Sequence, residues 1–295
     1  MAKISKLIIL TGLCFMCLGT IISAFNFNKL LSPYTELDGP YEERTIIIDN
    51  ENLQNLIIDV DNVPIYIVPT KDEKVKITYY ESKRTKFTTK ETKDSFTFKS
   101  KHKFIVLDMD FSFLFFDNKV TIEVPENMIL SYDIKTDNGR IEIKSLTVSD
   151  SKFETNNGRI KASSVKSDNG LEFRTSNGQI NLTGVRAFKI LAKTNNGSIN
   201  LKRVNTLKSI NATTDNGRIT LENLTSPNIK LTTNNGRVTG NILGDEIDYS
   251  RDLKTDNGHI TINGTRYADK IKDRQTKNKS LYIKTDNGNI DIDIY

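Results

Sequence analysis

The stretch Thr194-Asn195-Asn196-Gly197-Ser198-Ile199 is one of eight copies of a single motif, Thr-(Asp/Asn/Ser)-Asn-Gly-X-(Ile/Val). The spacings between successive motif glycines are 19, 20, 19, 20, 19, 22 and 30 residues. A period of about 20 residues indicates a repeat protein, in which each unit buries its apolar face only against its neighbours. The eight glycines are Gly139, Gly158, Gly178, Gly197, Gly217, Gly236, Gly258 and Gly288.

Apolar and polar residues alternate on both sides of each motif glycine. This period-2 alternation is typical of a strand that buries one face. Each unit is therefore predicted to be a strand, an Asn-Gly corner, a second strand and a second turn. The positions two residues after the glycine are Ile141, Ile160, Ile180, Ile199, Ile219, Val238, Ile260 and Ile290, and those five residues before it are Ile134, Phe153, Phe173, Ala192, Ala212, Leu231, Leu253 and Ile283.

Two all-β architectures fit this pattern. Asn-Gly between alternating strands is a strong hairpin signal, which would give an antiparallel meander. A β-solenoid would instead make each unit one coil of about 20 residues, with equivalent positions stacked about 4.8 Å apart. Stacked coils place like residues on like, and the same Thr, Asn and Gly recur in every copy. The pattern therefore favours a β-solenoid, and predicts that Ile199 and Ile219 lie on neighbouring coils, parallel and in register.

The Asn before the motif glycine is present in all eight copies. Stacked amide side chains can form a hydrogen-bonded ladder, and we expect these side chains to point inward at the corner. Asn216 would lie in the middle of the stack, whereas Asn287 would have a neighbour on one side only, because its coil is the last in the sequence. The residue before the Asn is Asp in four copies, including Asp215, and Asn or Ser in the other four, which indicates interchangeable turn residues that face outward.

The N-terminus carries Lys3 and Lys6 before an uncharged, largely apolar run over Leu7–Phe25. At about 1.5 Å per residue, a helix over this run approaches the thickness of a bilayer core, about 30 Å. Positive charge before the run would keep the N-terminus in the cytoplasm and place the rest of the chain outside. A transmembrane anchor is favoured over the alternative, a cleaved secretory signal. Cys14 and Cys17 are the only cysteines, so the exported part contains no disulfide.

These patterns divide the chain into four regions: a membrane anchor or signal peptide over 1–28, a linker over 29–44, a β-rich N-terminal cap or irregular first coils over 45–128, and the solenoid over 129–295. Phe104–Phe116 is the most apolar exported segment, either a buried cap strand or a contact with a membrane or partner. The spacings of 22 and 30 residues predict surface insertions, of which the larger, over residues 267–280, is expected to be a mobile excursion.

The run Lys119-Val120-Thr121-Ile122-Glu123-Val124-Pro125 leads into Ile134-Lys135-Thr136-Asp137-Asn138-Gly139-Arg140-Ile141. Together these segments resemble the bacterial "putative adhesin" family of β-strand-repeat domains, and the resemblance covers residues 45–295. It implies a right-handed parallel β-helix on the outer side of a bacterial membrane, and an association of some members with envelope-stress systems. It implies no catalytic residues.

An enzyme is the remotest alternative, because parallel β-helices include carbohydrate-active enzymes. A glycosidase needs two carboxylates about 5–9.5 Å apart. Four copies of the motif carry Asp before the Asn, but the other four carry Asn or Ser, which favours turn chemistry over catalysis. A calcium site needs several converging oxygen ligands, whereas this column offers one residue per coil. We therefore expect no enzymatic activity, no cofactor and no metal. The four acidic residues are Asp137, Asp215, Asp256 and Asp286.

A basic column directly follows the motif glycine and consists of Arg140, Arg159, Arg218 and Arg237. These arginines either pair with neighbouring carboxylates or form a stripe that binds anionic envelope polymers or lipid headgroups, in keeping with a formal net charge of +5. We expect a membrane-anchored, extracytoplasmic, non-enzymatic adhesin or cell-envelope binding module, with a role in envelope-stress sensing as the alternative. Its partners would be the membrane, anionic cell-wall polymers, lipid headgroups or envelope proteins, and not nucleic acid.

Overall fold

The computed structural model describes residues 41–82, 85–101, 118–273 and 277–295. The chain divides into two compact units. The first comprises Met1–Glu42, Glu81–Lys86 and His102–Asp117, and among its described residues Lys86 Nζ lies 3.2 Å from Glu81 Oε2. The second comprises Glu43–Tyr80, Phe87–Lys101 and Asn118–Tyr295.

Two predicted segments lie outside the described residues: the membrane anchor over 1–28 and the apolar segment Phe104–Phe116. Within the described ranges, no helix has the length and apolar character that a membrane span requires.

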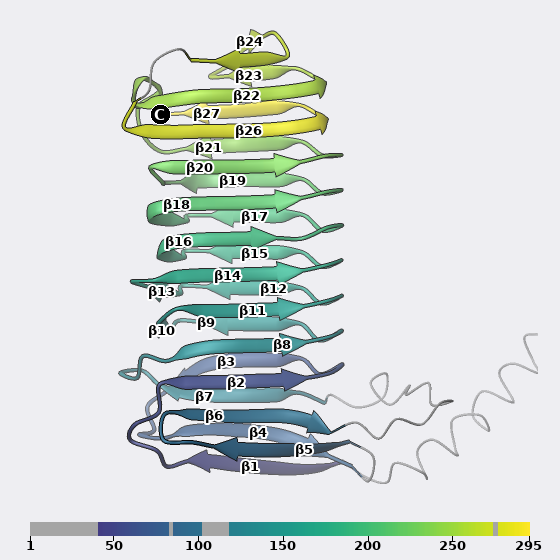
Figure 1. Ribbon diagram of the computed structural model, residues 1–295, viewed down its shortest axis with the longest axis vertical. Helices are drawn as coiled ribbons and strands as arrows, with labels where there is room; N and C mark the ends of the chain where they lie inside the picture. The colour runs from purple at the N-terminus through teal and green to yellow at the C-terminus, as the bar shows by residue number, and fades with distance from the viewer. Residues whose placement is uncertain (1–40, 83–84, 102–117, 274–276) are drawn as a thin grey trace, which may run out of the picture. The chain divides into compact units, whose positions relative to one another are not determined.

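The described strands form two sheets, A and B, and most neighbouring strands are parallel (Figure 1). In pairing order, sheet A contains β1 (Glu42–Ile48), β4 (Val75–Glu81), β7 (Val120–Pro125), β3 (Ile65–Thr70), β9 (Ile141–Lys144), β12 (Ile160–Ser163), β15 (Ile180–Thr183), β17 (Ile199–Lys202), β19 (Ile219–Leu224), β21 (Val238–Ile242), β27 (Ile290–Ile294), β23 (Ile260–Ile262) and β24 (Thr265–Tyr267).

Sheet B contains, in pairing order, β25 (Lys270–Lys272), β22 (Tyr249–Asn257), β26 (Lys279–Asn287), β20 (Asn228–Thr233), β18 (Asn205–Thr214), β16 (Arg186–Lys193), β14 (Gly170–Thr175), β11 (Ser151–Thr155), β8 (Ser131–Thr136), β2 (Asn55–Val60), β6 (Ser95–Lys101) and β5 (Lys86–Glu91). Two short strands, β10 (Thr147–Val148) and β13 (Lys166–Ser167), pair beside it, and one 3-10 helix, η2 (Glu246–Asp248), precedes β22.

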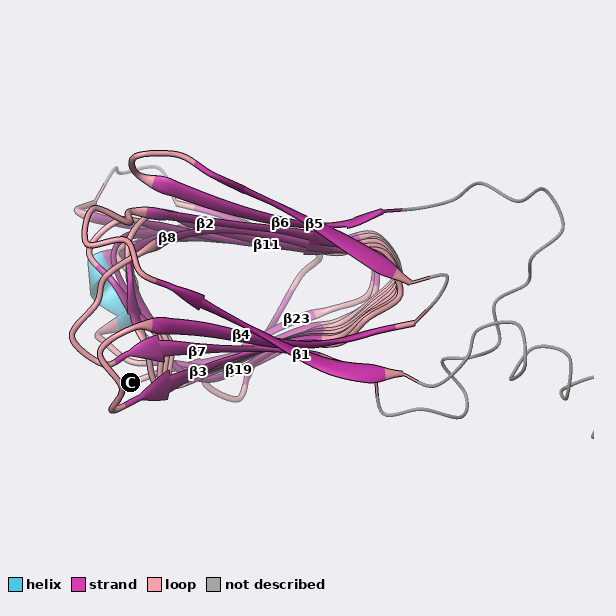
Figure 2. Cartoon of the chain, turned by 90° about the horizontal axis from the view of Figure 1, so that it is seen from below, coloured by secondary structure: helices cyan, strands magenta, loops and turns pink. Residues whose placement is uncertain are grey.

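The repeat is a solenoid coil, as the column pattern predicts. Ile199 in β17 pairs with Ile219 in β19, parallel and in register. The corner at Asn196-Gly197 leads from β16 in sheet B to β17 in sheet A, so it joins the two sheets rather than two strands of one hairpin. The antiparallel meander is therefore wrong. Viewed from the N-terminal end, the two sheets face each other across the core (Figure 2).

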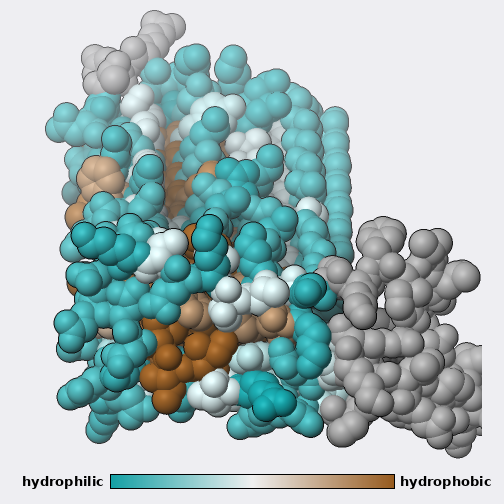
Figure 3. Space-filling model, turned by 60° about the horizontal axis from the view of Figure 1, so that its bottom comes forward, coloured by the Kyte–Doolittle hydropathy of each residue, from teal (hydrophilic) through white to brown (hydrophobic). Residues whose placement is uncertain are grey.

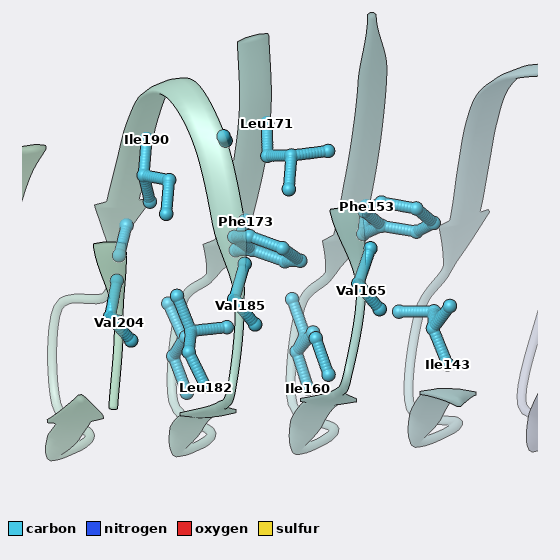
Figure 4. Close-up of a cluster of buried hydrophobic side chains, with 14 of the residues drawn as sticks. Ile143, Phe153, Ile160, Val165, Leu171, Phe173, Leu182, Val185, Ile190 and Val204 are labelled. Carbon is cyan, nitrogen blue, oxygen red and sulfur yellow. The ribbon is translucent and has the colours of Figure 1, made fainter. Parts of the chain in front are cut away.

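The core is built from the alternating apolar positions of the repeat. Ile143, Phe153, Phe173 and Leu182 are almost fully buried and project between the sheets (Figure 4). The rings of Phe153 and Phe173 stack with centroids 5.5 Å apart, because their strands β11 and β14 pair in register. Burial of each such side chain contributes about 1.5–3 kcal/mol, so the columns supply the main stabilisation of the stack.

At the C-terminal end, chain order and stack order differ. β27 lies between β21 and β23 in sheet A, and β26 lies between β20 and β22 in sheet B. The last coil of the sequence is thus inserted beneath the preceding one. The expectation that Asn287 belongs to the outermost coil is wrong, and Asn257 occupies that place.

The same end carries two antiparallel edge strands. β24 pairs with β23, and β25 pairs with β22. Tyr267 and Lys270–Lys272 lie within the segment expected to be a mobile excursion, and these residues are instead paired in the sheets. An antiparallel edge strand covers a sheet edge that would otherwise pair with another chain.

The face of the second unit that Figure 3 shows is mainly hydrophilic. Figure 3 shows hydrophobic side chains gathering toward the N-terminal end, where β1 and β5 are the edge strands. Ile47 in β1 is 62 % exposed.

Candidate anion-binding site at the Asn-Gly corner

The corner is closed from the inside by a column of buried threonines. Thr155 Oγ1 donates a hydrogen bond to the carbonyl oxygen of Gly139 at 3.0 Å, and accepts one from the backbone nitrogen of Gly158 at 3.1 Å. Thr194 makes the same pair of bonds to Gly178 and Gly197. Each hydroxyl therefore ties its own corner to the corner of the coil beneath. The column consists of Thr136, Thr155, Thr175, Thr194, Thr214, Thr233, Thr285 and Thr255.

The motif glycine is required by the close approach of stacked corners. A Cβ atom on Gly217 would lie 1.9 Å from the carbonyl oxygen of Gly197. A Cβ atom on Gly158 would lie 1.8 Å from the carbonyl oxygen of Gly139. No side chain fits at these distances, because the obstructing atoms belong to the backbone.

The asparagine ladder exists, but it faces outward. The Nδ2 atom of Asn216 donates to Oδ1 of Asn196 at 2.8 Å, and the Nδ2 atom of Asn235 donates to Oδ1 of Asn216 at 2.8 Å. The ladder side chains are exposed. The expectation of an inward asparagine ladder is therefore wrong, and the buried threonines take that role. Each ladder amide keeps a second N–H for a ligand.

The four predicted arginines lie on the corner beside this ladder, and all are exposed. Arg140 and Arg159 occupy neighbouring coils, as do Arg218 and Arg237. Two coils, with Gln179 and Ser198 at this position, separate the pairs. At about 4.8 Å per coil, about 14 Å separates Arg159 from Arg218 along the stack.

The two arginine pairs differ in their surroundings. The guanidinium carbon of Arg140 lies 5.2 Å from the centroid of the Tyr66 ring, and Arg140 also donates a hydrogen bond to the Tyr66 hydroxyl. Among the described residues, Arg159, Arg218 and Arg237 take part in no ion pair. Pairing with neighbouring carboxylates therefore does not account for the column.

Arg218 and Arg237 line a groove with a volume of about 610 Å³. Polar side chains and corner glycines form the rest of its wall. Two arginines and several asparagines therefore line one groove, and their side chains are suited to bind an oxyanion with adjacent hydroxyl groups. The other lining residues are Ser198, Asn216, Gly217, Asn235, Gly236, Asn287, Gly288 and Asn289.

The family Toastrack DUF4097 matches residues 53–294, which is most of the chain. The chain belongs to this family. The match includes the strands from β2 onward, before the first Asn-Gly motif, as well as every repeat, so the Toastrack unit comprises both. No curated protein matches the chain.

Solved structures resemble the Toastrack chain in fold. A "putative adhesin" from Bacteroides fragilis NCTC 9343 has a TM-score of 0.51 and 14 % identity, over 86 % of this chain and 97 % of that one. A "putative adhesin" from Parabacteroides distasonis ATCC 8503 has a TM-score of 0.47 and 12 % identity, over 88 % of this chain and 98 % of that one. At these identities the likeness concerns the fold alone.

Two parts of the Toastrack site were not predicted from sequence. The threonines point inward because every second residue of the strand is buried. Thr194 continues the series of buried residues Ile190 and Ala192. The contribution of Asn287 and Asn289 to the groove has no local signal, because it depends on the inserted last coil.

Proposed function

We propose that this Toastrack chain is a non-enzymatic, adhesin-like binding module that holds an anionic polymer of the cell envelope along its Asn-Gly corner. The observation that carries the proposal is the groove in which Arg218 and Arg237 lie beside the exposed amide ladder. A guanidinium group binds phosphate or carboxylate through two parallel hydrogen bonds. The second N–H of each ladder amide can donate to a ligand hydroxyl or ester oxygen.

A polymer fits this corner better than a small anion. The ladder continues along the whole stack of repeats, and the second arginine pair lies about 14 Å from the groove in the same column. An extended chain with repeated negative charges would reach both pairs at once. Linked contacts of this kind raise overall affinity without any single tight site.

The carboxylates support a binding role over catalysis. Asp256 and Asp286 lie on adjacent coils, but each has its own lysine, with Lys254 Nζ 2.6 Å from Asp256 and Lys284 Nζ 2.9 Å from Asp286. The hydrogen bond from Lys254 lowers the pKa of Asp256. A glycosidase needs one carboxyl group held protonated, whereas the ion pair with Lys254 favours the ionised form of Asp256.

The anchor forms the second part of the proposal. The run Leu7–Phe25 after Lys3 and Lys6 would hold the chain on the outer side of a membrane. Protease added to intact cells should then degrade the repeats. Protection of the repeats would refute this topology, and a mature N-terminus near Phe25 would refute the anchor.

The binding test compares two variants of equal charge. Replacement of Arg218 and Arg237 by Gln in the full chain should weaken binding to immobilised poly(glycerol phosphate) by about a hundredfold or more, because two charge-assisted hydrogen bonds are lost and each contributes about 1.5–3 kcal/mol. Replacement of Arg174 and Arg266 by Gln, off the corner, should leave binding within about twofold. Equal weakening by both variants would show that net charge alone is responsible, and would overturn the proposal.

A further inference from the structure

A second surface, on the connection from sheet A to sheet B, combines cations with exposed apolar side chains. Phe188 is 40 % exposed and Leu207 is 73 % exposed, on the adjacent strands β16 and β18 (Figure 1). Scattered exposed apolar residues are ordinary, but these two are neighbours and are surrounded by positive charge. The basic–apolar patch consists of Arg186, Phe188, Lys189, Arg203, Leu207 and Lys208.

A β-bulge creates the patch. Ala187 pairs with Thr206, and the next pair is Lys189 with Ser209, so β18 has one extra residue in this interval. The alternation of buried and exposed residues is broken there, and Leu207 and Lys208 are both exposed in succession. A β-bulge changes the direction in which the side chains point, and bulges are common beside functional sites.

The cations of the patch are free of carboxylate partners. Within the described part of the chain, none of its four lysines and arginines forms an ion pair. The neighbouring sheet faces differ, since Arg174 pairs with Glu172 and Lys202 with Glu222. Lys208 instead places its Nζ 5.5 Å from the centroid of the Phe188 ring. The patch therefore keeps both its charge and its apolar surface available.

Arg203 lies in the turn between β17 and β18. Its φ of +50° is left-handed, and the equivalent residues on the adjacent coils are Gly184 and Asn223. Glycine and asparagine tolerate this conformation, whereas a long side chain adopts it at a cost. The same left-handed turn recurs at Ser145 and Ser164, so it belongs to the coil itself. Here the residue adds a guanidinium group to the patch.

We propose that the basic–apolar patch docks on a membrane surface rich in anionic lipid headgroups. Phosphate groups would meet the four cations, while Leu207 and Phe188 would enter the boundary between headgroups and acyl chains. This pairing of basic and apolar side chains is what interfacial binding requires. A soluble polyanion offers no apolar phase for Leu207, so the patch fits lipid, whereas the wholly polar corner fits polymer.

The test uses the absence of tryptophan from the sequence. Leu207→Trp in the full chain gives a single reporter for this position, whatever else attaches the chain to a vesicle. Thr220→Trp on the outer face of sheet A is the matched control. Emission spectra would be recorded with vesicles of phosphatidylcholine alone, with vesicles that also contain phosphatidylglycerol, and with soluble poly(glycerol phosphate). Lipids brominated on the acyl chains would report depth.

Vesicles with phosphatidylglycerol should shift the emission of the Leu207→Trp chain to the blue and allow its quenching by brominated acyl chains, while the emission of the Thr220→Trp chain stays unchanged. Replacement of Lys189, Arg203 and Lys208 by Gln in the Leu207→Trp chain should lower the affinity of this response about a hundredfold. The proposal is overturned if the Leu207→Trp chain responds equally to phosphatidylcholine alone, if poly(glycerol phosphate) alone reproduces the shift, or if no shift occurs.

Discussion

The middle coils and the C-terminal coils are built from the same motif, yet only the middle coils stack in the order of the sequence. From Gly139 to Gly236, each corner rests on the one before it, and a Cβ atom on the glycine would lie 1.7–2.0 Å from the carbonyl oxygen beneath. At the end, Gly288 rests on Gly236, and Gly258 rests on Gly288, with Cβ distances of 2.1 Å in both cases.

The contacts that the inserted coil makes are equivalent to the contacts between the middle coils. Thr285 donates to the carbonyl oxygen of Gly236 at 2.8 Å, as Thr214 does to that of Gly197. Asn287 donates to Asn235 at 2.8 Å, as Asn235 does to Asn216. The motif therefore specifies how one coil rests on another, and does not specify which coil comes next. That choice depends on the longer connections and the edge strands at this end.

The largest effect should come from adding one methyl group to a corner in the middle. Gly217→Ala places a Cβ atom against the backbone of Gly197, and both coils are held by neighbours, so we expect a loss of about 3 kcal/mol or more. Gly258→Ala meets a similar obstacle in the outermost coil, which can shift, and should cost less. Denaturation in urea, followed by circular dichroism, measures both.

Gly264→Ala is the control for that comparison, because nothing lies within 4 Å of its Cβ position and its φ is +75°. It should cost about 1–2 kcal/mol from backbone strain alone. A Gly217→Ala chain as stable as the Gly264→Ala chain would show that the corners are not in tight contact.

Removing one hydroxyl group from the threonine column should have the next largest effect. Thr194→Val keeps the shape but leaves the carbonyl oxygen of Gly178 and the backbone nitrogen of Gly197 without this partner. We expect a loss of about 2 kcal/mol, because buried polar groups without partners are costly. Thr255→Val in the outermost coil should cost less.

Thr220 on the outer face of β19 provides the reference for the threonine column. Its replacement by Val should change stability by no more than about 0.5 kcal/mol. If all three variants are equally stable, the hydroxyl column does not hold the corners together.

Features that depend on neighbouring residues can be predicted from the sequence, whereas features that depend on distant segments cannot. The coil, the buried Ile199 and Ile219 and the corner glycines are determined by neighbours at a constant spacing, so the sequence pattern reveals them. The recurrence of Asn216 and its equivalents does not reveal their orientation, because an exposed ladder requires the same residue in every coil as a buried one does. The position of Asn287 could not be read from sequence at all, because identical motifs make any order of coils locally equivalent.

The C-terminal edge strand β25 should respond to acid while β18 does not. Arg251 in β22 donates to both carboxylate oxygens of Asp273, each at 3.0 Å. The hydrogen bond from Arg251 lowers the pKa of Asp273 below its usual value of 3.8. A lowered pKa in the folded state stabilises at pH values above 3.8, and this contribution is lost as the pH falls through the folded pKa.

The protection of the β25 amides against hydrogen exchange, corrected for the intrinsic effect of pH, should therefore fall about tenfold in acid. The protection of the β18 amides should not change. Asp273→Asn should expose β25 to the same degree at neutral pH and remove the pH dependence. An unchanged pH profile in this variant would mean that another group controls the edge.

The smallest effect on stability should come from the asparagine ladder. It also tests most directly whether the coils stack in the order of the sequence. Asn216→Ala and Asn287→Ala each remove an amide that bonds to neighbours on both sides, whereas Asn257→Ala removes one that bonds on one side. Because the ladder is exposed, each lost bond should cost only about 0.5 kcal/mol, the low end of the usual range.

Asn216→Ala and Asn287→Ala should therefore match each other at about 1 kcal/mol, with Asn257→Ala at about half that value. Asp215→Asn is the control, and should stay within about 0.5 kcal/mol, because an amide oxygen can still accept the bond from Asn234. All four variants would be compared by denaturation midpoint under one condition. If Asn287→Ala instead behaves as the weakest member and Asn257→Ala matches Asn216→Ala, the last coil of the sequence is also the last coil of the stack, and the inserted arrangement is wrong.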